Sequence, residues 1–250
     1  MSSPLPPEIL DLIIDHLLRR PATLKTCCIV SKSWVPRIRR HLFACVAFCD
    51  LKSHVELWKK AFPDPSNSPT HHTYTHSIHG SSGITTADAG VDGWIRTFRN
   101  VVHLQLTNMD LASLIPFYGL SPTLRSLSLN FTTASGVFGL VCSFPLPEDL
   151  AFGAFFTMRA VDGWNIPSTS PKLTGTLDLS TFEEARLVIR RLLDLPGGLC
   201  FSKINAPFFS ENAEALTDLV SRCSDTLEFL TVHYRPQGTS CDQPAPHRRS

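Results

Sequence analysis

Residues 124–129 read Leu-Arg-Ser-Leu-Ser-Leu, with apolar side chains at the first, fourth and sixth positions. The same spacing of apolar residues occurs at 101–106 and at 227–232. Within each stretch the last three residues alternate apolar, polar, apolar, which is typical of a β-strand with one buried face. The pattern therefore predicts short strands that present one face to a common core.

Three weaker copies lie between these stretches, centred on Leu150, Leu177 and Ile204. The central apolar residues of the six copies are at positions 104, 127, 150, 177, 204 and 230, at intervals of 23, 23, 27, 27 and 26 residues. Intervals of roughly 20–29 residues are typical of leucine-rich repeats. The alternative is an ordinary α/β domain whose strands are evenly spaced.

Helical periodicity fills several of the intervals between these strands. Residues 183–195 and 211–223 each place apolar side chains on one helix face, and 110–120 is a shorter candidate. Strands and helices that alternate at a fixed period predict a solenoid, with strands on its concave side and helices on its convex side. The last strand is followed by polar residues and has no cap. This predicts either a chain that is short relative to a working array or an edge covered by a partner.

A different pattern opens the chain. Residues 5–10 read Leu-Pro-Pro-Glu-Ile-Leu, and both proline and an acidic side chain are favourable in the first turn of a helix. The helix that follows is apolar nearly all round, which indicates burial on two sides, the second side by another protein or by this chain's own core. Pro21 is expected to end this helix, Thr23 to cap a second helix, and residues 36–43 to form a third.

This N-terminal segment resembles the F-box motif in the order, spacing and types of its residues. The matching positions are Leu5-Pro6-x-Glu8-Ile9-Leu10, Ile13, Leu17, Leu24, Cys27 and Val30-Ser31-Lys32-x-Trp34. Residues 30–48 are also similar to fungal, mushroom-type F-box families. F-box domains are small three-helix modules that bind the Skp-type adaptor of cullin–RING ubiquitin ligases, and they commonly precede leucine-rich repeats. The resemblance implies an α/β chain in which an all-α three-helix F-box is followed by a short, degenerate leucine-rich-repeat solenoid.

The resemblance also implies which side chains bind the adaptor. Those expected to face it are Leu5, Pro6, Ile9, Leu10 and Ile13. Three further residues are expected to complete either the three-helix core or the same interface, namely Leu24, Val30 and Trp34.

The predicted organisation has four parts. Residues 1–62 form the F-box-like domain, and residues 63–93, rich in Pro, Ser, Thr, His and Gly, form a flexible linker. Residues 94–234 form the leucine-rich-repeat-like domain, and residues 235–250 form a disordered tail.

Composition narrows the class of protein. Apolar residues make up 43% and charged residues 18% of the 250 positions, which excludes a wholly disordered chain. The net charge is +1, so neither nucleic acid nor an anionic membrane is expected as a partner. There is no run of about 20 unbroken apolar residues and no secretory signal pattern. The eight cysteines are therefore expected to be reduced thiols of a cytoplasmic or nuclear protein.

No catalytic motif stands out. A nucleophile elbow, a phosphate-binding loop, a dinucleotide fingerprint and paired Cys-x-x-Cys are missing, so no enzyme activity, cofactor or metal is expected. The one tempting cluster comprises His71, His72, His76 and His79. It lies in a proline-bounded segment without a neighbouring acid or cysteine, which favours a solvated loop over a metal site.

The favoured hypothesis is a non-catalytic, substrate-recognition subunit of an SCF-type ubiquitin ligase, which binds the Skp-type adaptor and through it a cullin. Its repeats would hold a protein substrate with the outward polar residues of the strands. The candidates are His103, Gln105, Arg125, Ser128, Asp178, Lys203, Asn205, Thr231 and His233. The main alternative is a protein-interaction scaffold whose F-box-like domain acts outside a ubiquitin ligase. A weaker alternative is an enzyme or metal protein centred on the loop histidines.

Overall fold

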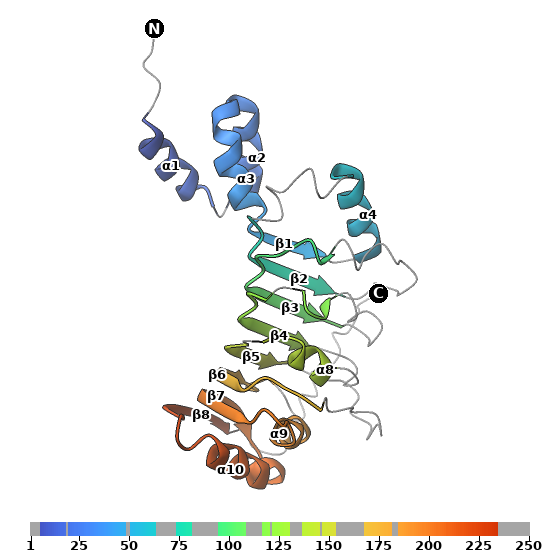
Figure 1. Ribbon diagram of the computed structural model, residues 1–250. Coiled ribbons are helices and arrows are strands. Elements are labelled where there is room, and N and C mark those ends of the chain that lie inside the picture. Colours follow the sequence, from blue (N-terminus) through green and yellow to red (C-terminus); the bar gives the residue numbers. More distant parts are fainter. Residues whose placement is uncertain are drawn as a thin grey trace, which may run out of the picture.

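The computed structural model describes residues 6–18, 20–48, 51–63, 74–81, 95–108, 117–120, 122–130, 137–145, 147–153, 168–181 and 185–234. Within these ranges, a group of N-terminal helices leads into one eight-stranded parallel sheet with helices along it (Figure 1). The chain is of the α/β class, as its sequence predicts. The tail expected at 235–250 lies outside the described residues.

Three helices come first: α1 (Pro7–His16), α2 (Pro21–Val30) and α3 (Val35–Leu42), with a short 3-10 helix, η1 (Lys32–Trp34), before α3. Each α-helix has a proline in its first turn. N–H groups in the first turn have no partner within the helix, so the N–H that proline lacks costs no helical hydrogen bond. Pro21 therefore begins α2 rather than ending the preceding helix. For the same reason Thr23 lies inside α2 and is not its cap.

These helices share a small apolar core of their own. Ile14, Leu24 and Ile38, one from each helix, are at most 1% exposed. Partly buried side chains surround them, namely Leu10, Leu17, Cys27, Cys28, Trp34 and Leu42. This core is separate from the large apolar cluster beneath the sheet.

The sheet is made of strands of four to ten residues, in chain order. They are β1 (Cys45–Phe48), β2 (Ser77–Ser81), β3 (His103–Thr107), β4 (Ser126–Asn130), β5 (Asp149–Phe152), β6 (Leu173–Asp178), β7 (Leu199–Phe208) and β8 (Phe229–Tyr234). Each strand pairs in parallel with the next one along the chain, so the spatial order is also β1 to β8. Such an order requires every connection between strands to return the chain to the same end of the sheet.

The register of the sheet follows the leucine spacing. Leu104 pairs with Leu127, Leu127 with Leu150, Leu150 with Leu177, Leu177 with Ile204, and Ile204 with Leu230. The six positions indexed from sequence therefore form one line across the sheet, which we call the central row. The first five members are at most 2% exposed, whereas Leu230 is 45% exposed.

Two further strands extend the central row upstream. Val46 pairs with Ile78, and Ile78 pairs with Leu104. The interpretation of residues 63–93 as a linker is therefore wrong for Ser77–Ser81, which forms β2 between β1 and β3. Its sequence, Ser-Ile-His-Gly-Ser, has one apolar side chain and a buried glycine where β3 carries a leucine. Pairing on both sides, rather than strand propensity, makes this segment a strand.

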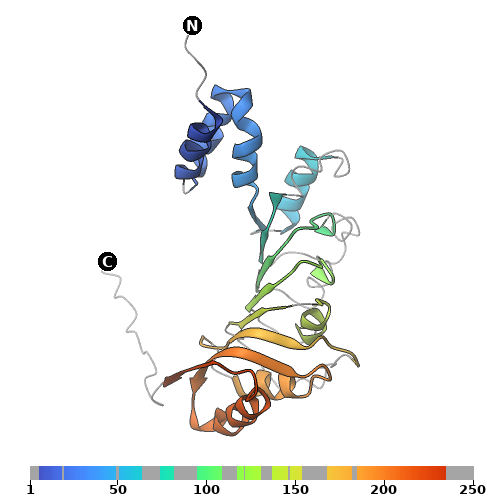
Figure 2. The same ribbon diagram turned by 60° about the vertical axis from the view of Figure 1, so that its left-hand side comes forward.

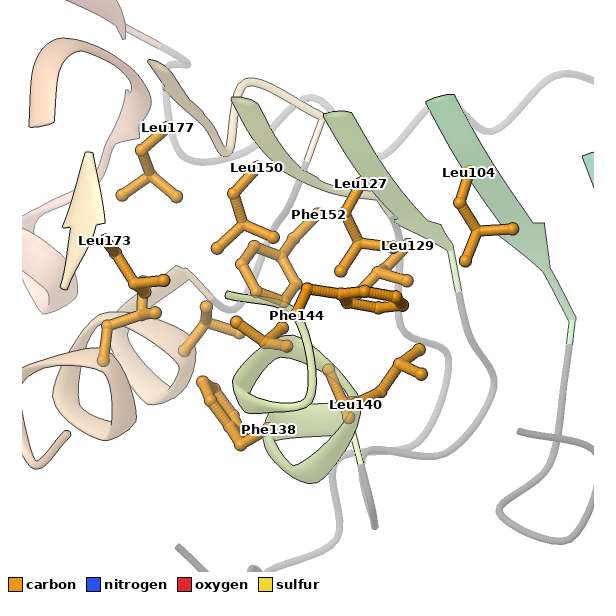
Figure 3. Packing of buried hydrophobic residues seen from close by; sticks show 14 of the residues in the cluster. Leu104, Leu127, Leu129, Phe138, Leu140, Phe144, Leu150, Phe152, Leu173 and Leu177 are labelled. Carbon is orange, nitrogen blue, oxygen red and sulfur yellow. The ribbon is translucent and has the colours of Figure 1, made fainter. Parts of the chain in front are cut away.

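Helices cover one face of the sheet. Figures 1 and 2 show α4 (Leu51–Ala61), α8 (Val137–Cys142), α9 (Ala185–Leu193) and α10 (Ala213–Arg222) on the same side of the strands. Apolar side chains of α8, α9 and α10 join the central row in one core. In Figure 3 leucines of neighbouring strands point toward Phe144 and α8. The helices predicted at 183–195 and 211–223 are confirmed by α9 and α10, whereas 110–120 lies mostly outside the described residues.

Backbone contacts repeat from strand to strand. The His76 carbonyl accepts hydrogen bonds from the N–H groups of Val102 and His103 at 2.8 and 2.9 Å. One strand later, the Val102 carbonyl accepts bonds from Arg125 and Ser126 at 3.0 and 2.9 Å. Because β2, β3, β4 and β5 each start from this contact with the preceding strand, the register passes along the first five strands.

Gly175 adjusts the register where β6 meets its neighbours. Its φ is +75°, and a Cβ atom there would lie 1.7 Å from the carbonyl oxygen of Glu148. The pairing with β7 shifts between Gly175 and Thr176. Only glycine combines this left-handed backbone with so close an approach, and the irregularity leaves Leu177 in the central row.

An aromatic cluster around Trp58 of α4 joins the N-terminal helices to the sheet. The Trp58 ring centroid lies 5.6 Å from Phe43, 5.1 Å from Phe62, 6.3 Å from Phe48 and 6.2 Å from Phe98. Aromatic pairs at such distances contribute about 0.5–1.5 kcal/mol each beyond their buried area. β1 and α4, which the sequence groups with the first domain, therefore pack with the sheet.

Candidate functional site

Three large apolar side chains are exposed on α1, on the same side as the exposed His16 at the end of the helix. Ile9, Leu12 and Ile13 are 43, 66 and 40% exposed. At 3.6 residues per turn these three side chains occupy a sector of about 100°. We call them the α1 apolar face. Clustered large apolar side chains in contact with water mark an interaction surface, because their burial by a partner is favourable.

Polar contacts hold the other exposed edge of α1 against α3. The Arg37 Nη2 group donates hydrogen bonds to both carboxylate oxygens of Asp15 at 3.1 Å. Arg37 Nε lies 3.4 Å from Asp11 Oδ1, and His41 Nε2 lies 3.0 Å from Asp15 Oδ1. With Ile14 packed into the helical core, these contacts fix the rotation of α1 so that the α1 apolar face stays in solvent.

The adaptor-binding residues expected from sequence divide into three groups. Pro6, Ile9, Ile13 and Val30 are exposed. Leu10 and Trp34 are half-buried against the helical core, and Leu24 is only 1% exposed, so its side chain belongs to that core rather than to a surface. Leu5 lies outside the described residues.

Three exposed apolar residues of the N-terminal helical segment were not among the expected ones, namely Leu12, Leu18 and Ile29 at 66, 48 and 86% exposure. Their apolar character was visible in the sequence. Which side of an all-round apolar helix meets the core depends on its packing partners, and the sequence does not show that choice.

The second candidate surface is the face of the sheet opposite the helices. Residues that alternate with the central row point to this side, and we call it the open face. One line across it is Ala47, His79, Gln105, Ser128, Ala151, Asp178, Asn205 and Thr231. A second line is Cys45, Ser77, His103, Ser126, Asp149, Thr176, Lys203 and Phe229.

Seven of the nine substrate-binding candidates fall on these two lines, namely His103, Gln105, Ser128, Asp178, Lys203, Asn205 and Thr231. His233 follows Thr231 on β8 at the next position that points to the same side, and it is exposed. Arg125 precedes β4 and forms an ion pair with Glu148. Sequence reasoning missed His79 because β2 was taken for a linker. The signal that could have found it is Ile78, which lies 26 residues before Leu104.

The open face is long, and its charges are mixed. At about 4.8 Å between strands, eight strands span roughly 34 Å, enough for an extended peptide of about ten residues. Asp149 and Asp178 contribute negative charge, whereas the Lys203 ammonium lies 5.4 Å from the centroid of the Phe229 ring. The open face therefore combines acidic, basic and aromatic side chains.

Two of the described thiols, Cys142 and Cys223, are partly and fully buried, respectively. Burial raises the pKa of the Cys142 thiol to about 11, and burial also raises the pKa of Cys223, so both stay protonated near neutral pH. Among the described side chains, no group of three or more His, Cys, Asp or Glu could hold a metal ion. The loop interpretation is wrong for His79, which lies in β2, whereas His76 directly precedes the strand. His71 and His72 lie outside the described ranges.

A depression of about 570 Å³ lies between α9 and α10. It is lined by Arg190, Leu193, Asp194, Asp218, Ser221 and Arg222. Arg190 of α9 forms an ion pair with Glu214 of α10 at 3.4 Å, and this exposed pair links the two helices. Arg191 pairs with Asp194 at 3.6 Å within the same helical segment.

Within the described ranges, every helix is too short or too polar to cross a lipid bilayer. Comparison with known proteins returned no match to a protein-family model, to a curated protein or to a solved structure.

Proposed function

We propose that this chain is a substrate-recognition subunit of an SCF-type cullin–RING ubiquitin ligase. In this proposal α1, α2 and α3 form the F-box, which binds a Skp-type adaptor and through it a cullin. The sheet and its helices form a leucine-rich-repeat solenoid with its strands on the concave side. The open face of the sheet then holds a protein substrate.

The observation that carries the proposal is the α1 apolar face. Ile9 and Ile13 belong to the residues that the F-box resemblance assigns to the adaptor, and both are at least 40% exposed. The polar contacts of Asp11 and Asp15 with Arg37 leave that face free. A helix held in this way presents Ile9, Leu12 and Ile13 for burial against another molecule.

The central row supports the second half of the proposal. Six positions with irregular intervals of 23–27 residues would fall in one register by chance only rarely, yet they pair neighbour to neighbour. Parallel strands in chain order, with helices on one side, are what leucine-rich repeats require. Asn130 at the end of β4 fits the asparagine that often follows such strands.

The chain would take no part in the chemistry of ubiquitin transfer. Its role would be to hold the substrate close to the charged ubiquitin-conjugating enzyme, which raises the effective concentration of substrate lysines. The proposal places the protein in the cytoplasm or nucleus, where the six described cysteines, all free, would remain reduced.

The proposal is tested by co-expressing the full chain with a Skp-type adaptor and purifying the complex through a tag on the adaptor. We expect a stable complex with the unmodified chain and its loss in the double variant Ile9→Asp, Ile13→Asp. Leu187→Asp on α9 is the matched control, because Leu187 and Ile13 are both 40% exposed. A folded chain that fails to bind any Skp-type adaptor would instead support the scaffold alternative.

A further inference from the structure

The last strand of the sheet presents an unusual edge. All the residues of β8 are exposed, including Leu230 and Val232 at 45 and 42% and Phe229 and Tyr234 at 59 and 74%. Exposed edge strands normally carry lysine, other charges or proline, which discourage pairing with another chain. The sequence Phe-Leu-Thr-Val-His-Tyr carries none of these. Among the described strands, only β7 pairs with β8.

We propose that the β8 edge pairs with the same edge of a second copy of this chain, across a two-fold axis. In an antiparallel pair, opposed residues share a face of the sheet, which allows registers centred on Thr231 or on Val232. Centred on Thr231, Leu230 of each copy lies opposite Val232 of the other, and Phe229 lies opposite His233. The apolar side chains that β8 leaves exposed beside the core then cover each other.

Charge and area favour this occupant. The residues of β8 include no Asp, Glu, Lys or Arg, so antiparallel pairing of the strand with its own copy opposes no like charges. A fully buried aromatic side chain covers about 150–250 Å², and an aliphatic one covers somewhat less. At the exposed fractions of Phe229, Leu230, Val232 and Tyr234, roughly 450 Å² of apolar surface is therefore open to solvent on each copy. With the edge backbone included, two copies bury about 1,000 Å², near the lower limit for a specific interface. The pair should therefore be weak and visible at micromolar concentrations.

The test is sedimentation velocity of the full chain from about 1 to about 100 µM, the range for a weak interface. We expect a reversible dimer, and we expect Val232→Lys and Thr231→Lys each to weaken it at least about 10-fold. Gln105→Lys, on the open face of β3 away from the edge, is the matched control and should dimerise like the unmodified chain.

Two results would overturn the proposal. One is a chain that stays monomeric at the highest concentration, because the edge is then covered in some other way. The other is a dimer that survives both β8 lysines but is lost in the variant Ile9→Asp, Ile13→Asp, which would place the contact on the α1 apolar face. Circular dichroism of each variant confirms that it is folded.

Discussion

Leu150 provides the sharpest test of the register, because its strand has the weakest leucine pattern in the sequence. It is 2% exposed and pairs with Leu127 on one side and Leu177 on the other. Replacing a core leucine by alanine typically costs 2–5 kcal/mol, through lost burial and the cavity that remains. We expect Leu150→Ala to lower the free energy of unfolding by about 3 kcal/mol, or the melting temperature by roughly 6–12 °C for a chain of this size.

The assay is urea unfolding followed by circular dichroism, with the slope compared between variants so that a change in midpoint reports stability. Leu127→Ala, in the neighbouring strand of the same row, should cost a similar amount. Ala151→Ser, the next residue on the open face, should change stability by less than about 0.5 kcal/mol. A loss below about 1 kcal/mol for Leu150→Ala would show that this position is not in the core and would refute the register argument.

Three further predictions concern the backbone, an ion-pair cluster and a thiol. Gly175→Ala should destabilise the fold by several kcal/mol because its Cβ would meet a carbonyl, whereas Gly198→Ala, with φ +77° and open space, should cost only about 1–2 kcal/mol in thermal unfolding. Arg37→Met should cost about 1 kcal/mol, and less in 1 M salt, because its ion pairs to α1 are partly exposed. Iodoacetamide should label exposed Cys45 well before Cys142, which we expect to react only as the pH approaches 11. Since the folded protein keeps the Cys142 proton that the unfolded chain releases near pH 9, stability should fall between pH 9 and 11 in urea titrations.

The strands could be predicted where leucines mark them. The positions 104, 127, 150, 177, 204 and 230 were all confirmed as neighbours in one row, although the sequence around Leu150 is weak. A strand needs only one or two buried side chains when its backbone pairs on both sides. The same fact explains why β2 was missed, since Ile78 is its one apolar residue and Gly80 fills a buried position.

The helices show a different limit of sequence reasoning. α9 and α10 have one apolar stripe each and were found at the expected places. α1 is apolar on most sides, so its sequence predicts that two sides are buried without saying which residues meet the core. The structure assigns Ile14 to the core and leaves Leu12 exposed, and it places Leu24 inside the helical core rather than on a surface.

Adaptor binding by α1 is tested most directly by the affinity of a purified Skp-type adaptor for the full chain and for Ile13→Asp, measured by isothermal titration calorimetry. Ile13 is 40% exposed on a helix that the Arg37 contacts hold in place, so the variant should stay folded. If α1 binds the adaptor, a charge in that interface should weaken binding by about 2 kcal/mol or more, which is roughly 30-fold, while Leu187→Asp should leave it unchanged. Equal affinities for the chain and for Ile13→Asp, or no heat of binding from either folded protein, would contradict adaptor binding through α1.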